Sequence, residues 1–307
     1  MGLSIKHLLG LKGVSKDDIT AILDSADSFY EVLNREIKVV PTLRGKTVVN
    51  FFYENSTRTR ISFEMAEKRL SASPLNFSTS TSSVSKGETL KDTIRNIEAM
   101  KIDMVVVRHG SAGVPKFLTE TTDATIINAG DGFHEHPTQA LLDIMTIRQK
   151  LGRLDGLKVA IVGDILHSRV ARSNAFGMKT MGMDVTLCGP QTFLPQHPEM
   201  LGVKVTTDLN EAICDADVVM MLRPQLERQT HGLFPSIREY RELYGLDRDK
   251  LKIMRDDVII MHPGPINRGV ELESEVADSD RSVILDQVTN GVATRMAVLY
   301  LLGGEHE

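Results

Sequence analysis

The chain has 307 residues, 41% of them apolar and 25% charged, and its formal net charge at pH 7 is −5. This length predicts about two domains, and the composition is that of an ordinary soluble globular protein. The sequence has no cluster of Lys and Arg, no Trp and no apolar run long enough to span a bilayer. We therefore expect neither nucleic-acid binding nor membrane insertion.

The N-terminal segment and the cysteines indicate a cytoplasmic protein. The first residues lack a long apolar stretch followed by a small-residue cleavage site. Cys188 and Cys214 are far apart and lie inside apolar or helical stretches. We expect both to be reduced core residues without a metal or redox role.

Short apolar runs recur along the chain, and nearly all are continuous rather than alternating. Continuous Val and Ile runs are typical of strands buried on both faces, and hence of parallel sheets covered by helices. The predicted strands lie at 47–52, 103–107, 125–128, 157–163, 184–188, 217–222 and 257–261.

Amphipathic segments separate these strands. The segment 89–100 places Leu90, Ile94 and Ile97 on one helical face, and the segment 137–152 begins with Pro137 and ends with Gly152. A last helix covers about 287–302. The order of elements predicts an α/β protein of two domains, each a mostly parallel sheet flanked by helices.

The first predicted strand runs into "YENSTRTRISFE", residues 53–64. A helix with Phe63 and Ala66 on one face begins within this stretch, and a helix N-terminus with hydroxyl and guanidinium groups favours an anion such as phosphate. The alternative is a plain cap at Asn55 or Ser56 with solvated arginines. Arginine in a first turn opposes the helix dipole, which makes the plain cap less favourable.

Polar loops follow most of the predicted strands. In open α/β sheets ligands bind outside the carboxyl ends of the strands, so these loops predict a binding cleft. They cover 53–60, 108–110, 128–139, 163–169, 223–228 and 262–265. The serine-rich segment 78–88 is predicted to be a loop.

Seven motifs carry a resemblance to the aspartate carbamoyltransferases. They are "FYENSTRTR" (52–60), "SSVSKGETLKDT" (82–93), "VVRH" (106–109), "NAGDGFHEHPTQALLD" (128–143), "VGDILHSRVARSN" (162–174), "MLRPQLER" (221–228) and "MHPGPINRGVE" (261–271). The resemblance covers essentially the whole chain and implies transfer of the carbamoyl group of carbamoyl phosphate to the amino group of L-aspartate. This reaction belongs to pyrimidine synthesis.

The resemblance assigns a role to individual residues. Carbamoyl phosphate is implied to bind Ser56, Thr57, Arg58, Thr59, Ser82, Arg108, His136, Gln139 and the main chain of Gly264 and Pro265. Aspartate is implied to bind Lys86, Arg169, Arg223 and Gln225. The residues expected to act in catalysis are Arg58, Thr59, Lys86, Arg108 and His136.

The resemblance also implies an organisation. Residues 1–136 with a C-terminal helix at about 287–307 form the carbamoyl phosphate-binding domain, and 137–286 form the aspartate-binding domain. The loop with Ser82 and Lys86 reaches a neighbour's active site in a homotrimer. The resemblance does not decide whether a regulatory chain or a dihydroorotase is a further partner.

The sequence allows three alternative interpretations. His134 and His136 suggest a metal, but they flank a single residue, no thiolate or third histidine is nearby, and the family needs neither metal nor cofactor. Ornithine carbamoyltransferase is the nearest rival, although Arg223 would repel a cationic substrate side chain. The other rival is a catalytically silent homologue. Val170, Pro224 and Gly264 depart from the pattern of better-known members.

Overall fold

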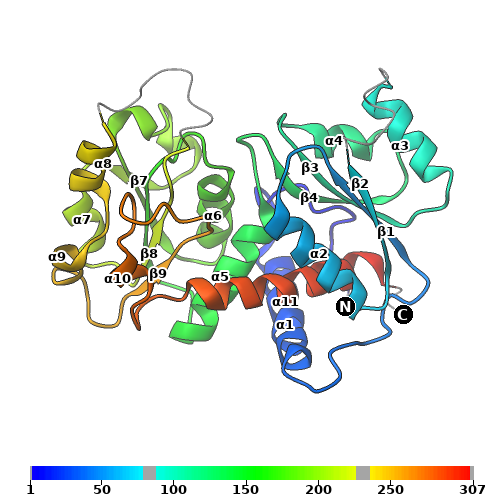
Figure 1. Cartoon of the computed structure of the whole chain (residues 1–307), viewed down its shortest axis with the longest axis horizontal. Helices are drawn as coiled ribbons and strands as arrows, with labels where there is room; N and C mark the ends of the chain where they lie inside the picture. Colours follow the sequence, from blue (N-terminus) through cyan, green and yellow to red (C-terminus); the bar gives the residue numbers. More distant parts are fainter. Residues whose placement is uncertain (1, 79–87, 226–235, 305–307) are drawn as a thin grey trace. The chain divides into compact units, whose positions relative to one another are not determined.

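The computed structural model describes residues 2–78, 88–225 and 236–304. The chain divides into two compact units. Unit 1 comprises Met1–Leu142 and Thr289–Glu307, and unit 2 comprises Asp143–Val288. Each unit has its own parallel sheet with helices around it (Figure 1). The predicted fold class is confirmed.

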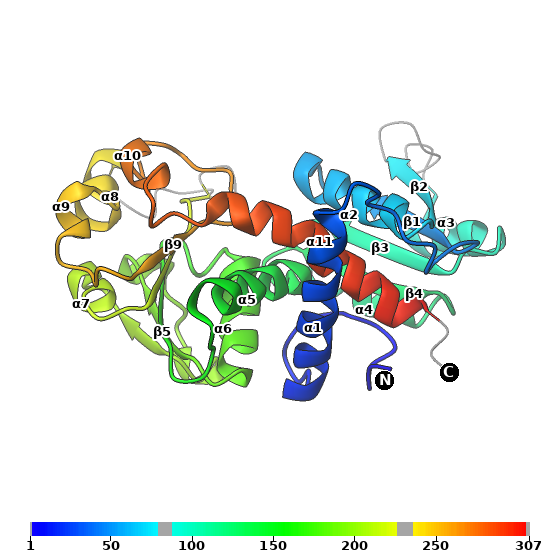
Figure 2. The same ribbon diagram turned by 90° about the horizontal axis from the view of Figure 1, so that it is seen from below.

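Unit 1 contains a sheet of four parallel strands in the order β2-β1-β3-β4. Its strands are β1 (Thr47–Phe52), β2 (Ser73–Ser78), β3 (Met104–His109) and β4 (Thr125–Asp131). Its helices are α1 (Lys16–Leu33), α2 (Thr57–Arg69), α3 (Leu90–Glu98), α4 (Val114–Thr119), the start of α5 (Pro137–Leu151) and most of α11 (Ile284–Gly303). Helix α1 packs on α11 through Phe29 and Tyr300, whose ring centroids are 5.7 Å apart (Figure 2).

The two faces of β1 contact different helices because successive strand residues point to opposite sides of a sheet. Val49 packs in an apolar cluster with Ile94 of α3 and Leu118 of α4. Asn50, the next residue, donates a hydrogen bond to Glu67 of α2. Helix α2 therefore covers one face of the sheet, and α3 and α4 cover the other.

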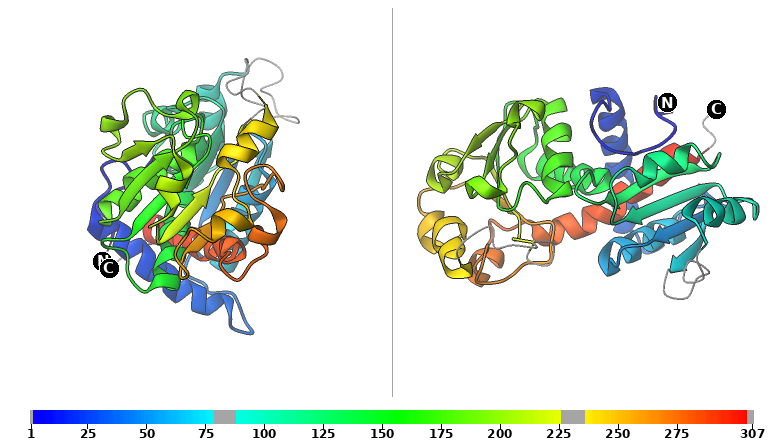
Figure 3. Two further views of the ribbon diagram at one scale, coloured as in Figure 1. Left: turned by 90° about the vertical axis from the view of Figure 1, so that its left-hand side faces the viewer. Right: turned by 90° about the horizontal axis from the view of Figure 1, so that it is seen from above.

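Unit 2 contains five parallel strands in the order β7-β6-β5-β8-β9. They are β5 (Lys158–Val162), β6 (Asp184–Cys188), β7 (Lys204–Thr206), β8 (Val218–Met221) and β9 (Ile259–Met261). The helices here are the rest of α5, α6 (Arg169–Thr180), α7 (Leu209–Ile213), α8 (Ile237–Tyr244), α9 (Arg248–Leu251) and α10 (Ser274–Ala277), with two short 3-10 turns at Gln191–Phe193 and Pro198–Met200. Helix α6 lies on one face of this sheet and α8 with α9 on the other (Figure 3).

All seven predicted strands are present, with ends that differ by up to three residues. The sequence reading missed β2 and β7. Most residues of these strands are exposed or half-buried, as in Leu75 at 48% and Val205 at 38%, and each strand lies at a sheet edge. Unlike the edge strands β4 and β9, which are buried, β2 and β7 lack the continuous apolar run on which the prediction depended.

The prediction of two core cysteines is half wrong. Cys188 ends β6 inside the core, and burial raises the pKa of its thiol to about 12. Cys214 is exposed, because it lies at the C-terminus of the short helix α7, where the chain faces solvent. Among the described residues, no helix is long and apolar enough to cross a membrane.

Candidate active site

The strand order of each sheet has one point where the chain reverses its direction of winding. In unit 1 the chain moves from β1 outward to β2, then returns to β3 on the other side of β1. In unit 2 the same reversal separates β5 from β8. Loops diverge at such a point and leave a crevice outside the carboxyl ends of the two strands. Of the candidate residues, Arg58, Arg108, Arg169 and Arg223 lie at or beyond the ends of these strands. His136 and Gln139 instead follow β4, and Gly264 and Pro265 follow β9.

Helix α2 begins at the carboxyl end of β1, as the sequence predicted. Ser56 is its N-cap residue with extended backbone, and its side chain makes no capping hydrogen bond. The first turn contains no acidic residue but holds Arg58, which is exposed, and Thr59, which is 9% exposed. Ser56 therefore does not cap the helix with its side chain, and an anion at this N-terminus stays the prediction.

Arg108 lies near the end of the neighbouring strand, β3, and is 9% exposed. Its Nη1 donates to the carbonyl of Ala129 at 3.2 Å, and its Nη2 pairs with Glu54 Oε1 at 2.8 Å. Two fixed partners orient the guanidinium at the carboxyl end of β3. The sequence reading did not single out Glu54, although it lies within the quoted "ENSTRTR" motif.

His136 and Gln139 begin α5, which follows β4. His136 is 4% exposed, and its carbonyl accepts the N–H of Gln139 at 3.0 Å. His134 instead pairs with Asp131 at 3.1 Å, and Glu135 accepts the N–H of Leu11 at 2.6 Å. The three residues of the "HEH" motif thus have different partners and do not form one cluster of ligands. Within residues 2–78, 88–225 and 236–304, no group of three potential metal ligands occurs.

In unit 2, a buried carboxylate links the two loops at the reversal between β5 and β8. Asp164 Oδ1 contacts the His167 ring at 2.8 Å, and its Oδ2 accepts the N–H of Gln225 at 3.3 Å. Gln225 Nε2 also donates to the carbonyl of His167 at 3.2 Å. These contacts fix Gln225 beside the loop that leads to Arg169. The sequence reading missed the role of Asp164.

The two arginines predicted for aspartate follow these same strands. Arg169 is the first residue of α6 and is 5% exposed, with Ser168 as the N-cap. Arg223 is half-buried, one residue beyond Leu222. The chain after β5 passes close to the chain after β8 at Gly163 and Leu222. Only glycine allows this contact, because a Cβ on residue 163 would lie 2.3 Å from the Leu222 carbonyl oxygen.

The loop after β9 is held by a buried histidine and glutamate. His262 Nδ1 accepts the N–H of Gly264 at 2.8 Å, so its other ring nitrogen, Nε2, donates to Glu271 Oε1 at 3.2 Å. The same Oε1 accepts the N–H of Asn267 at 2.6 Å. Gly264 has φ 65°, a conformation that glycine adopts without a Cβ penalty, and precedes the exposed Pro265. Hydrogen bonds to the buried side chains of His262 and Glu271 thus fix the main chain of this loop.

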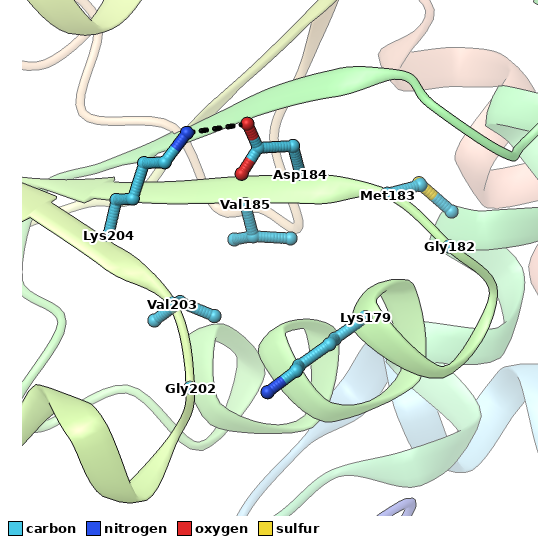
Figure 4. Close-up of a pocket in the computed structure, with 8 residues that line it drawn as sticks. All are labelled: Lys179, Gly182, Met183, Asp184, Val185, Gly202, Val203 and Lys204. Atoms are coloured by element: carbon cyan, nitrogen blue, oxygen red, sulfur yellow. Dashed lines mark hydrogen bonds and ion pairs between the residues drawn. The ribbon is translucent and has the colours of Figure 1, made fainter.

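Two predicted site residues, Ser82 and Lys86, lie outside the described residues. A hollow of about 470 Å³ in unit 2 also lies apart from the candidate site (Figure 4). Its lining includes Asp184 and Lys204, the first residues of β6 and β7. It therefore lies at the amino edge of the sheet, opposite the loops described above.

Comparison with known proteins identifies the family. The carbamoyl-P binding domain of aspartate/ornithine carbamoyltransferases matches residues 6–149, and the Asp/Orn binding domain matches residues 155–302. The chain belongs to the aspartate/ornithine carbamoyltransferase family.

Close relatives narrow this assignment. The chain is 59% identical over 304 residues to the aspartate carbamoyltransferase catalytic subunit of Syntrophotalea carbinolica, covering 99% of this chain and 97% of that one. It is 60% identical over 299 residues to that of Syntrophus aciditrophicus, covering 97% of each chain. Within the family the chain is therefore an aspartate carbamoyltransferase, and the predicted resemblance and activity are confirmed.

Solved structures agree with the fold. The aspartate transcarbamoylase of Trypanosoma cruzi, in complex with N-(phosphonacetyl)-L-aspartic acid, superposes with a TM-score of 0.88 at 31% identity, covering 96% of this chain and 95% of that one. The catalytic subunit from M. jannaschii has a TM-score of 0.84 at 36% identity, covering 97% and 98%.

Proposed function

We propose that unit 1 binds carbamoyl phosphate and unit 2 binds aspartate through the residues that resemble those of the family. The observation that supports this division is that Arg58 and Arg108 lie at the ends of β1 and β3 in unit 1, and Arg169 and Arg223 follow β5 and β8 in unit 2, where each sheet reverses its winding. Unit 1 contributes hydroxyl, amide and arginine donors at α2, which suit a phosphate. Unit 2 contributes Arg169 and Arg223, which suit two carboxylates.

The proposed reaction is a direct attack of the aspartate amine on the carbonyl carbon. A C–N bond forms, the carbonyl oxygen gains negative charge, and the C–O bond to phosphate then breaks. Donors from Thr59, Arg108 and His136 would stabilise that oxygen as an oxyanion hole, and Arg58 would stabilise the leaving phosphate. The phosphate is the proposed acceptor of the amine proton, so no enzyme carboxylate is required as a base.

Charge supports aspartate over ornithine as the second substrate. Arg223 and Arg169 are cationic, and a guanidinium pairs with a carboxylate through two parallel hydrogen bonds. A cationic side chain such as that of ornithine would be repelled by the same groups. Gln225, held by Asp164 and His167, adds a neutral amide.

We further propose a homotrimer in which Ser82 and Lys86 of one chain serve the active site of its neighbour. A cyclic trimer has heterologous contacts, in which one patch of a subunit meets a different patch of the next. The relatives named above are catalytic subunits, which is consistent with a larger assembly that contains another kind of chain.

Arg223→Ala tests the division of labour between the units. Loss of a charge-assisted pair costs about 1.5–3 kcal/mol, so we expect the KM for aspartate to rise roughly 10- to 100-fold. The dissociation constant for carbamoyl phosphate, measured by calorimetry, should stay within about twofold of wild type. Arg238→Ala, an exposed arginine on α8, is the matched control and should change neither constant. Equal loss of both affinities would contradict the division.

A further inference from the structure

Helix α2 carries a buried acid that the proposed reaction does not use. Glu67 is 0% exposed and lies on the face of α2 that meets β1. Asn50 of β1, also 0% exposed, donates from Nδ2 to Glu67 Oε2 at 2.8 Å. No cationic group is paired with Glu67 in the part of the chain that the structure describes. An ionised carboxylate in such a place would be costly.

Two buried oxygens in this pair have no hydrogen-bond partner among the described residues. They are Glu67 Oε1 and Asn50 Oδ1. A proton on Oε1 would turn that oxygen into a donor, and the orphaned amide oxygen of Asn50 is the acceptor it needs. One proton would therefore satisfy both atoms and complete a two-bond pair between an acid and an amide. Buried polar groups are nearly always satisfied, which favours this arrangement.

We propose that Glu67 is a positioning residue that carries a proton at neutral pH and, paired with Asn50, fixes the phosphate-binding helix α2 on strand β1. This inference rests on the proposed role of the α2 N-terminus. Glu67 lies eight residues beyond Thr59, a rise of about 12 Å along the helix, so it acts through the helix and does not touch the ligand.

The charged surroundings agree with a proton on Glu67. Burial raises its pKa from the ordinary 4.5 to about 8, the Asn50 hydrogen bond opposes this shift, and Glu64 adds to it. Lys68 lowers the pKa only weakly, since it is exposed and already paired with Glu64 at 2.7 Å. Strands β1 and β2 contribute no ionisable side chain to α2.

A second set of contacts holds the middle of α2. Arg295 of α11 donates to Ser62 Oγ at 2.9 Å and lies over the Phe63 ring at 5.1 Å. Arg295 is therefore the charged side chain of α11 that contacts α2. Since Arg295 contacts the middle of the helix and Glu67 lies near its end, removal of the Glu67 pair should loosen α2 without detaching it.

The test compares the wild type with Glu67→Gln and Glu67→Leu. Glutamine keeps both hydrogen bonds without a titrating group, and leucine keeps the volume but leaves Asn50 unpaired. Binding of carbamoyl phosphate and of inorganic phosphate is measured from pH 6 to 9. The ratio of wild-type to Gln affinity at each pH cancels the titration of the ligand itself.

We expect this ratio to be near one below pH 7 and to fall as pH rises through about 8. Glu67→Leu should bind both ligands at least several-fold more weakly at every pH. In unfolding experiments, the wild type should lose about tenfold in its folding equilibrium constant per pH unit relative to Gln between pH 4.5 and 8, because only the native state retains the proton there. Above pH 8 the loss should stop.

Isotope-edited infrared spectroscopy gives a readout that needs no ligand. The difference between wild type and Glu67→Gln at pH 7 should contain the C=O stretch of a protonated carboxyl. A carboxylate spectrum at pH 7 would overturn the proposal, as would a Leu variant that binds phosphate as the wild type does. Failure of the wild type to bind carbamoyl phosphate would instead refute the proposed function, and the infrared result would still stand.

Discussion

Replacing Arg58 by alanine is expected to lower kcat by about 10²–10³-fold, the cost of removing one donor from a site of developing charge. Arg58 lies in the first turn of α2 and is exposed, so its charge is not part of the core, and in the proposed function it serves the phosphate. The fold should therefore survive. Steady-state kinetics and thermal unfolding of the same preparation separate the two effects.

Arg60→Ala is the matched control for this variant. Arg60 belongs to the same helix turn and is also exposed, but it has no assigned role. We expect its kcat to stay within about threefold of wild type. If Arg58→Ala unfolds cooperatively at a lower temperature and keeps full activity per folded molecule, the charge of Arg58 serves stability and its catalytic role is wrong.

The second large effect is recovery of activity from two inactive chains. Lys86→Ala and Arg58→Ala homotrimers should each be nearly inactive. In a mixed trimer, a site is intact only where the chain that supplies Arg58 and the neighbour that supplies Lys86 are both unmodified at those residues. Random reassembly of an equal mixture makes this true for one of four neighbour combinations, so we expect about a quarter of wild-type activity.

Reassembly must be shown separately, for example by native mass spectrometry of chains with different tags. Each variant dissociated and reassembled alone is the control. If mixed trimers are present and activity stays at the level of these controls, each site is built within one chain and the shared-site proposal fails.

The sequence predicted the fold where the physical signal is local. Strand β1 and helix α2 follow from a continuous apolar run, a polar turn and an apolar face at helical spacing. Strand β2 has no such signal, because its sequence SPLNFS mixes polar residues with Pro74 and its Leu75 is exposed. Its pairing with β1 is a long-range contact that no window of neighbouring residues reveals.

The residues of the candidate site also fall into those that the sequence identified and those that it missed. Arg58, Arg108 and Arg223 lie at or soon after the carboxyl ends of strands, so motif and position together identified them. Glu54 and Asp164 lie in the same motifs, but their roles depend on partners 54 and 61 residues away.

The sequence contains one weak indication of the pair between Glu67 and Asn50. Asn50 is a polar residue inside a buried apolar strand, and such a residue needs a partner. Its partner lies 17 residues further along, on the next helix. Only the three-dimensional structure shows that the two meet and that two of their oxygens are unsatisfied.

The most direct test of the account is the choice of acceptor amine by the purified chain. The chain is incubated with carbamoyl phosphate and either L-aspartate or L-ornithine, and both the carbamoylated amino acid and released phosphate are measured. We predict carbamoyl aspartate and phosphate in equal amounts, with no citrulline above the background of an Arg58→Ala preparation. Citrulline formation, or phosphate release that does not depend on aspartate, would contradict the account.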